Sequence, residues 1–303
     1  MKKVYVYHHN DHDGIVAAGV LYNLYPESHN VEFIFNMIDY AKEINLDHID
    51  FDNDDEVYFL DYSFTNEHNL NEFKKLLDLR RTCDLHKVVW IDHHKSSLGI
   101  LDGYTIAGTI DTTLCGAALT YLYFQPQDNE YELPGPYFHK DPSVPLFLKY
   151  IDDYDCWKHL YPETNDFHYG LTVSDPTDPI ISNLLYSRNG IDNIIFAGKK
   201  VQEYLRFENK EYHVDMCGFE YKLPDEHGGL RCLCLNRKGN SLMFGDKIND
   251  YDAVIPFYFN GTKWTYSIFT VKDQVSCEAV AKSYGGGGHI RAAGWTSDEL
   301  IFK

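Results

Sequence analysis

The sequence lacks long apolar runs and is poor in positive charge. No stretch of its 303 residues approaches the roughly 18 consecutive apolar residues of a membrane helix, and residues 1–9 do not fit a signal peptide. Lys and Arg number 27 against 46 Asp and Glu, which gives a formal net charge of −19. Such a surface repels phosphate backbones and anionic lipids. We therefore expect a soluble, cytoplasmic protein that binds neither a membrane nor a long nucleic acid.

Cysteine is also sparse and shows no pairing pattern. The seven cysteines are scattered, and only Cys232 and Cys234 stand close together, without the second pair that a zinc site requires. We expect them to be reduced. Hydrophobic residues at 44% and charged residues at 24% are typical of a globular chain. Because the length is about twice the ~150 residues of one domain, we expect two domains.

Short apolar runs alternate with helical segments in the first part of the chain. The runs predict strands at residues 3–7, 31–35, 57–60 and 88–91, and helices are expected at residues 15–24 and 69–79. Strands that alternate with helices are typical of a parallel sheet with helices on its faces. The fold class predicted here is therefore α/β.

The pattern changes further along the chain, first to helices and then to strands. Helices are expected at residues 113–124, 146–155 and 191–212, and strands at residues 230–235, 253–259 and 263–271. Asn260-Gly261 predicts the turn between the last two strands. We therefore expect a parallel-sheet domain at residues 1–175, a helical linker at 176–213 and a smaller α+β domain at 214–303.

Polar side chains follow three of the predicted strands. His9, Asp11 and Asp13 follow the first strand, Asp61 follows the third, and Asp92-His93-His94 ends the fourth. Ligands of parallel sheets bind beyond the carboxyl ends of the strands, so we expect these residues to lie along one edge. Each motif has a simpler interpretation, because a polar turn that caps a helix uses the same residue types and a single Asp or His is often structural.

The joint occurrence of these residues favours a metal site. With Asp153, which stands near a predicted helix end, the carboxylates of Asp11, Asp13 and Asp61 carry a charge of −4 that two divalent cations would cancel. Without cations, such a cluster is strongly unfavourable. Carboxylate and imidazole ligands suit Mn²⁺, Mg²⁺ or Fe²⁺, and we expect Mn²⁺, with Mg²⁺ as the alternative. Two such ions serve the hydrolysis of phosphate esters.

A run of four glycines near the end of the chain offers a second candidate site. Gly285 to Gly288 are followed by His289, Arg291 and a compact Ala-Ala-Gly. Backbone N–H groups of a glycine run can turn inward to hold an anion, and an Arg side chain can bind two phosphate oxygens. A flexible turn is the simpler explanation, but the adjoining His and Arg favour phosphate binding.

These motifs, in this order, resemble the DHH/DHHA1 phosphoesterases. The set comprises His-x-Asp-x-Asp-Gly, an Asp after a second strand, Asp-His-His, an Asp before Trp157, and Gly-Gly-Gly-Gly-His-x-x-Ala-Ala-Gly. It spans residues 7–294. The resemblance implies an N-terminal DHH domain on a parallel sheet, a helical linker, and a C-terminal DHHA1 domain that holds the substrate across a cleft.

The resemblance also implies roles for individual residues. One metal ion is expected on His9, Asp11 and Asp61, and a second on Asp13, Asp61, His93 and Asp153, with Asp61 as the bridge. Two assignments stay open, because Asp155 fits the fourth motif as well as Asp153 does, and His8 can exchange roles with His9.

The remaining roles concern the substrate. His94 is expected to face or orient the scissile phosphate, and Gly286, Gly287, Gly288 and His289 to grip the terminal phosphate or nucleotide. Arg291 is added on chemical grounds alone. The predicted catalytic residues are thus Asp61 and His94.

The function favoured by the resemblance is a metal-dependent phosphodiesterase that acts as an exonuclease on di- to penta-nucleotides and releases nucleoside 5′-monophosphates. Its substrate would be a short oligonucleotide, and a homodimer is compatible with the sequence. A phosphoesterase for cyclic dinucleotides or 3′,5′-bisphosphate nucleotides is the alternative enzyme. A non-catalytic nucleotide-binding regulator of the same fold is the alternative from another class.

Overall fold

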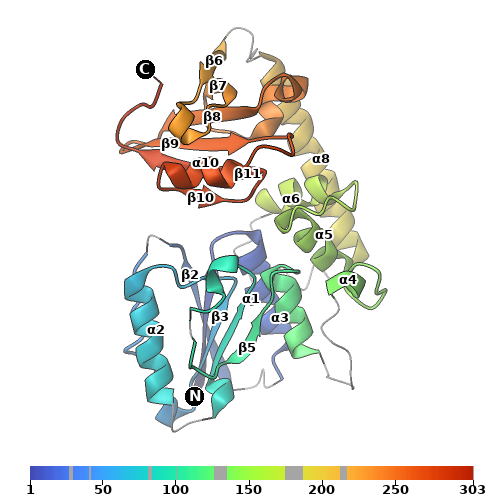
Figure 1. The fold of residues 1–303 in the computed structure, drawn as a ribbon. Coiled ribbons are helices and arrows are strands. Elements are labelled where there is room, and N and C mark those ends of the chain that lie inside the picture. The colour runs from blue at the N-terminus through green and yellow to red at the C-terminus, as the bar shows by residue number, and fades with distance from the viewer. Residues whose placement is uncertain are drawn as a thin grey trace. The chain divides into compact units, whose positions relative to one another are not determined.

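The computed structural model describes residues 1–26, 30–40, 42–80, 84–100, 102–125, 135–174, 187–211 and 217–302. The chain divides into two compact units, Met1–Val201 and Gln202–Lys303 (Figure 1). This boundary falls inside the segment predicted as a linker, of which residues 176–186 and 212–213 lie outside the described part of the chain. None of the described helices is long and apolar enough to cross a membrane.

A five-stranded sheet forms the centre of the first unit. Its strands are β1 (Lys2–His9), β2 (Val31–Ile38), β3 (Glu56–Leu60), β4 (Val88–Asp92) and β5 (Ala107–Ile110). The order is β2-β1-β3-β4-β5, and every neighbouring pair is parallel. The predicted α/β fold with a parallel sheet is confirmed, and the edge strand β5 is an addition to it.

Both faces of this sheet are buried. Successive side chains of a strand point to opposite faces, and along β1 Val4 and Val6 belong to one apolar cluster while Tyr5 and Tyr7 belong to another. The first cluster contains residues of α1 (His12–Leu24), α3 (Gly116–Phe124), α5 (Leu146–Asp155) and α6 (Thr164–Thr172). The second contains Phe73, Leu76 and Leu77 of α2 (Glu67–Leu79). Helices therefore cover both faces, as the continuous apolar strands require.

The other helices of this unit are short, except the last. They are η1 (Phe51–Asn53), η3 (Leu85–Lys87), η4 (Lys95–Ser97), α4 (Gly135–Phe138) and α8 (Arg188–Glu211). Helix α8 agrees with the helix expected at residues 191–212 and contains the boundary between the two units.

The second unit is built on a mixed sheet. Its strands are β6 (Phe219–Lys222), β7 (Arg231–Asn236), β8 (Ala253–Phe259), β9 (Trp264–Phe269), β10 (Gly287–Gly288) and β11 (Ala292–Ser297). The order is β10-β11-β9-β8-β7-β6, with only β7 and β8 parallel. Its helices are η5 (Asp225–His227), η6 (Ser241–Asp250) and α10 (Cys277–Ser283). The turn predicted at Asn260 closes with a hydrogen bond of 2.9 Å to the carbonyl of Lys263.

Candidate metal centre

The parallel sheet brings the first three predicted motifs together. Strands β1, β3 and β4 are neighbours in the order of the sheet, and the motifs follow their carboxyl ends. His9, Asp11 and Asp61 each offer a ligand atom, and these atoms lie within 4.8 Å of one another. The Nδ1 atom of His9 is 2.7 Å from Oδ2 of Asp11 and 3.9 Å from Oδ2 of Asp61. The first predicted set of ligands is therefore assembled.

A second set of carboxylates surrounds His93. Its Nε2 atom lies 3.2 Å from Oδ1 of Asp61, 3.4 Å from Oδ2 of Asp155 and 3.7 Å from Oδ2 of Asp13. Asp61 is thus shared between the two sets, in the place where the sequence analysis expected a bridging ligand. Both of its side-chain oxygens are buried and have no hydrogen-bond partner among the described residues.

The backbone at Asp61 is strained. Its φ of 55° lies in the left-handed region, where residues other than glycine are uncommon. The N–H of Asp61 donates to the carbonyl of Ile91 at 2.8 Å, which ties this conformation to the neighbouring strand. Strain of this kind persists only where the surrounding structure enforces it, and it is concentrated at functional sites.

The N-terminus of α3 holds Asp13. The N–H groups of Gly116 and Ala117 donate to its two carboxylate oxygens at 2.6 and 2.7 Å. Position 116 has no room for a side chain, because a Cβ atom there would lie 2.7 Å from Cβ of Asp61 and 3.1 Å from Oδ2 of Asp13. The sequence analysis missed Gly116. The only indication in the sequence was a glycine near the start of a predicted helix, and such a glycine does not by itself indicate a functional site.

The structure places Asp155, and not Asp153, in the cluster. Asp153 is buried elsewhere, where its carboxylate accepts hydrogen bonds from the N–H groups of Leu160 at 2.6 Å and Tyr161 at 3.3 Å and from the hydroxyl of Thr164. Residues two apart on a helix are about 200° apart around its axis, so only one of the two can face the sheet edge. The prediction of Asp153 as a metal ligand is therefore corrected, because Asp155 is the residue of this segment that lies in the cluster.

A second network that the sequence analysis missed supports this end of α5. Asp152 is fully buried and accepts from the N–H of Cys115 at 2.8 Å, and it lies 2.5 Å from both Nε2 of His139 and Nζ of Lys158. Because Cys115 directly precedes α3, this network fixes the helix that binds Asp13. The sequence signal was a third Asp in the same segment, without any indication of its partners.

His94 is oriented from behind by Asp92. Its Nδ1 atom is 2.7 Å from Oδ1 of Asp92, whose other oxygen accepts from the hydroxyl of Ser97. The Nε2 atom of His94 is 3.4 Å from the hydroxyl of Tyr40, and 28% of the side chain is exposed. His94 thus presents Nε2 outward. His8 is buried and its Nδ1 contacts the carbonyl of His9, so His9 is the residue in the ligand set.

The electrostatics of the cluster are those of crowded carboxylates. Burial, followed by the charge of Asp13, raises the pKa of both Asp61 and Asp155 well above the ordinary value. Burial also raises the pKa of Asp13, against the attraction of His93. At Asp11 burial acts in the same direction, but the hydrogen bond from His9 outweighs it and the pKa is lowered. Burial opposes the charge of His94, yet the hydrogen bond to Asp92 raises its pKa above the usual value.

These observations fit bound divalent cations. Buried carboxylate oxygens without donors, as on Asp61 and Asp155, are costly unless a cation or proton compensates them. Oxygen and imidazole donors are the ligands that Mn²⁺ and Mg²⁺ accept, the latter with more oxygen. The donor set therefore fits the predicted metals, without selecting between them.

The glycine run of the second unit was expected to bind an anion through its backbone N–H groups, but two of these groups are bonded within the protein. The N–H groups of Gly285 and Gly286 donate to the carbonyls of Lys282 and Ala281 at 3.0 and 2.8 Å, and so cap α10. Gly287 and Gly288 form β10 and pair with β11. A Cβ atom at Gly286 would lie 2.1 Å from the carbonyl oxygen of Gly294, so close packing explains this glycine. The expectation that the N–H of Gly286 cradles an anion is wrong, because the helix end uses it.

The turn after β10 carries the two cationic candidates. The N–H of His289 donates to the carbonyl of Ala292 at 2.7 Å, so His289 offers only its exposed side chain. Nη2 of Arg291 bonds to Asp273, whereas Nη1 is buried without a hydrogen-bond partner among the described residues. Gly287 and Gly288 thus position this turn, and its side chains are the groups that can meet an anion.

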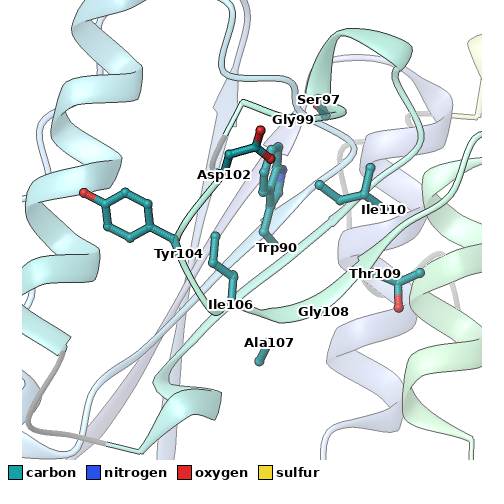
Figure 2. A pocket seen from close by; sticks show the side chains of 10 residues that line it. All are labelled: Trp90, Ser97, Gly99, Asp102, Tyr104, Ile106, Ala107, Gly108, Thr109 and Ile110. Carbon is teal, nitrogen blue, oxygen red and sulfur yellow. The ribbon is translucent and has the colours of Figure 1, made fainter.

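A hollow outside the cluster lies beside β4 and β5. Its volume is about 230 Å³, and Figure 2 shows Trp90 together with residues of the segment 97–110 around it. The indole N–H of Trp90 donates to the carbonyl of Tyr62 at 2.9 Å. The lining contains no predicted ligand and no cationic side chain. This hollow is therefore not the site of the predicted chemistry.

Comparison with known proteins finds similarities in sequence and in fold. No protein-family profile matches the chain. An uncharacterised protein of Acanthamoeba polyphaga mimivirus is 23% identical over 163 residues, which cover 52% of this chain and 38% of the viral protein. The oligoribonuclease NrnB of Bacillus subtilis is 24% identical, and the match covers 99% of this chain and 74% of NrnB. A solved structure described as the DHH domain of a member of a ribosomal-protein family matches with a TM-score of 0.57 and 14% identity, over 97% of this chain and 82% of that one.

A carboxylate and imidazole cluster at the carboxyl edge of a parallel sheet can hold the two metal ions that hydrolysis of a phosphate ester uses. The chain shares the fold of this DHH domain, and the order of its motifs resembles that of the DHH/DHHA1 phosphoesterases.

Proposed function

We propose that this protein is a metal-dependent phosphodiesterase that hydrolyses very short oligonucleotides from one end and releases nucleoside 5′-monophosphates. The observation that carries the proposal is Asp61, which lies between two sets of ligands with both oxygens buried and without donors. The match to NrnB, an oligoribonuclease, over nearly the whole chain supports the substrate class. The net charge of −19 argues against long strands, which need a basic groove.

The ligands proposed for the two ions are the side chains that the cluster brings together. One ion would be held by His9, Asp11 and Asp61, and the other by Asp13, Asp61, His93 and Asp155. When bound, two divalent ions supply charge neutralisation, polarisation of a phosphoryl oxygen and a hydroxide nucleophile near neutral pH. No side-chain nucleophile is then needed.

The chain's own residues position the phosphate. His94 receives its orientation from Asp92, and the hydrogen bond to Asp92 raises the pKa of His94, which favours the form with a proton at Nε2. That N–H donates to an oxygen of the scissile phosphate. In the second unit, His289 and Arg291 are the side chains that the sequence analysis assigns to phosphate binding. Replacing Arg291 with Ala is expected to raise KM more than it lowers kcat.

A substrate panel tests the proposal. Purified protein with Mn²⁺ is incubated with an RNA dinucleotide, a single strand of roughly 20 nucleotides, beyond one compact site, a cyclic dinucleotide, a 3′,5′-bisphosphate nucleotide and pyrophosphate. We expect the dinucleotide to be hydrolysed fastest, and Asp61→Asn to remove all turnover. Preference for the cyclic dinucleotide or the bisphosphate would transfer the proposal to the alternative enzyme. Retained turnover in Asp61→Asn would contradict the role of Asp61.

A further inference from the structure

A hollow of about 170 Å³ lies in the first unit beside the metal centre. Asp11, Asp13 and Asp155 of the cluster line one part of it. The other part is formed by α5 and α6, which pack against each other (Figure 1), and it includes Tyr154 and His168. The volume suits one ring system, since an apolar cavity of roughly 150 Å³ holds a benzene ring. The hollow therefore joins the anionic centre to a compartment for a single flat group.

The wall of this compartment is aromatic. The rings of Tyr154 and His168 are stacked, with centroids 3.5 Å apart and an angle of 10° between the planes. Phe167 is buried and lies beside them in the lining. A stacked pair of this kind forms a rigid surface of two rings. Such surfaces bind flat heteroaromatic groups, and they do so with little regard for the identity of the group.

Two histidines add polar groups to the compartment. Nδ1 of His12 lies 3.1 Å from Nδ1 of His168, and both residues line the hollow. Only one proton fits between these two nitrogens, so one ring donates and the other accepts. The outer nitrogen of each ring, Nε2, then takes the opposite role to the Nδ1 of the same ring, so that one Nε2 is a donor and the other an acceptor.

The two Nε2 atoms have no hydrogen-bond partner in the part of the chain that the structure describes, and neither belongs to the buried polar atoms that lack one. A pair of core histidines would be expected to satisfy these atoms within the protein. Here a donor and an acceptor next to each other stay available to a ligand. The order of donor and acceptor is reversed when both rings change tautomer together, so that the shared proton lies on the other Nδ1 and solvent carries the outer proton from one Nε2 to the other.

We infer that this hollow binds the nucleobase of the nucleotide at the scissile phosphate, with the His12 and His168 pair on the base edge. The inference rests on the proposed function, since it places the base beside the centre that holds the phosphate. The Watson–Crick edge of each common base has a donor next to an acceptor, in one order or the other. The reversible pair meets both orders. The site therefore requires a base but tolerates all four.

The first test compares substrates with and without a base. The specificity ratio is kcat/KM for a dinucleotide divided by kcat/KM for the same dinucleotide with one abasic ribose at the cleaved end. We expect His168→Phe, which keeps a ring against Tyr154 but loses the nitrogens, to lower this ratio roughly tenfold, the effect of about one lost hydrogen bond. His86→Phe, on the exposed η3, is the matched control and leaves the ratio unchanged.

If the wild type prefers the substrate with a base and His168→Phe has the same specificity ratio, the proposed base site is wrong and the proposed phosphodiesterase activity is unaffected. Equal cleavage of both substrates by the wild type leads to the same conclusion. A wild type that cleaves no diester contradicts the proposed function instead. The second measurement below then decides on the base site without turnover.

The second test measures the binding of nucleosides, which lack a phosphate, to the full chain. Binding is monitored by NMR through the ¹⁵N resonances of the histidine rings. Adenosine and uridine are expected to shift the Nε2 signals of His12 and His168, and ribose is expected to leave them in place. This measurement also stands in for the first if His168→Phe does not fold. The absence of any shift with both nucleosides would overturn the inference.

Discussion

Replacing Asp61 with Asn is expected to stabilise the metal-free protein while abolishing its response to divalent cations. Oxygens of Asp61, Asp13 and Asp155 all lie within 3.7 Å of Nε2 of His93, so no two of them are more than about 7 Å apart. At that separation, two unit charges repel by about 2 kcal/mol in an effective dielectric of roughly 20. Asp61 meets two such repulsions, and the attraction of His93 offsets part of them. A net gain of about 2 kcal/mol remains.

The assay is thermal unfolding in the presence of a chelator. For a unit of about 200 residues, a gain of about 2 kcal/mol raises Tm by roughly 4–8 °C. The raised pKa of Asp61 sets the pH dependence, since the folded state holds this proton to a higher pH than the unfolded state. The wild type therefore loses stability as pH rises above the ordinary value of 3.8, and the difference from Asp61→Asn grows toward alkaline pH.

If Asp61→Asn melts below the wild type near pH 8 with chelator present, or if the difference is the same near pH 5.5, the carboxylates are not in electrostatic conflict. Asp246→Asn, on the exposed surface of η6, is the control and is expected to change neither Tm nor its pH dependence.

Three further predictions follow from the site. Asp155→Asn is expected to remove the rise in Tm that Mn²⁺ causes. Asp153→Asn is expected to keep that rise but to lower the free energy of unfolding by about 1–3 kcal/mol, because it breaks buried hydrogen bonds. Calorimetric titration with Mn²⁺ distinguishes the two variants. Gly116→Ala is expected to lower the free energy of unfolding by about 1–3 kcal/mol and to weaken Mn²⁺ binding, because the new Cβ atom would contact Asp61. Unchanged affinity for Mn²⁺ would show that the site adapts to the extra methyl group. Removing cations by chelation is expected to lower the free energy of unfolding by about 2.7 kcal/mol relative to Mn²⁺ at 100 times its Kd, and to lower Tm reversibly. A melting curve that does not change with Mn²⁺ would argue against the metal centre.

The parallel sheet was predictable from the sequence because its strands are buried on both faces. Val57 to Leu60 and Val88 to Ile91 are continuous apolar runs, and they are the strands β3 and β4. Strand β5 escaped prediction, since its residues Ala-Gly-Thr-Ile carry little apolar signal. Gly108 has a φ of 120° and packs against the carbonyl of Trp90, a tertiary requirement that no local pattern indicates.

The candidate site was predictable where strand ends fix the positions. His9, Asp11, Asp61 and His93 meet because parallel strands end at one edge. Asp155 was left open against Asp153, since the choice depends on how α5 is rotated about its axis, and packing sets that rotation. The donors from Gly116 and Ala117 to Asp13 come from more than 100 residues away, and a separation of that size leaves no trace in local spacing.

The most direct test of the central claim is anomalous diffraction from a crystal of the full chain grown with Mn²⁺. Anomalous peaks are expected beside the side chains of Asp61 and His93, one toward His9 and Asp11 and one toward Asp13 and Asp155. A well-ordered structure with no peak within coordination distance of Asp61 would contradict the claim.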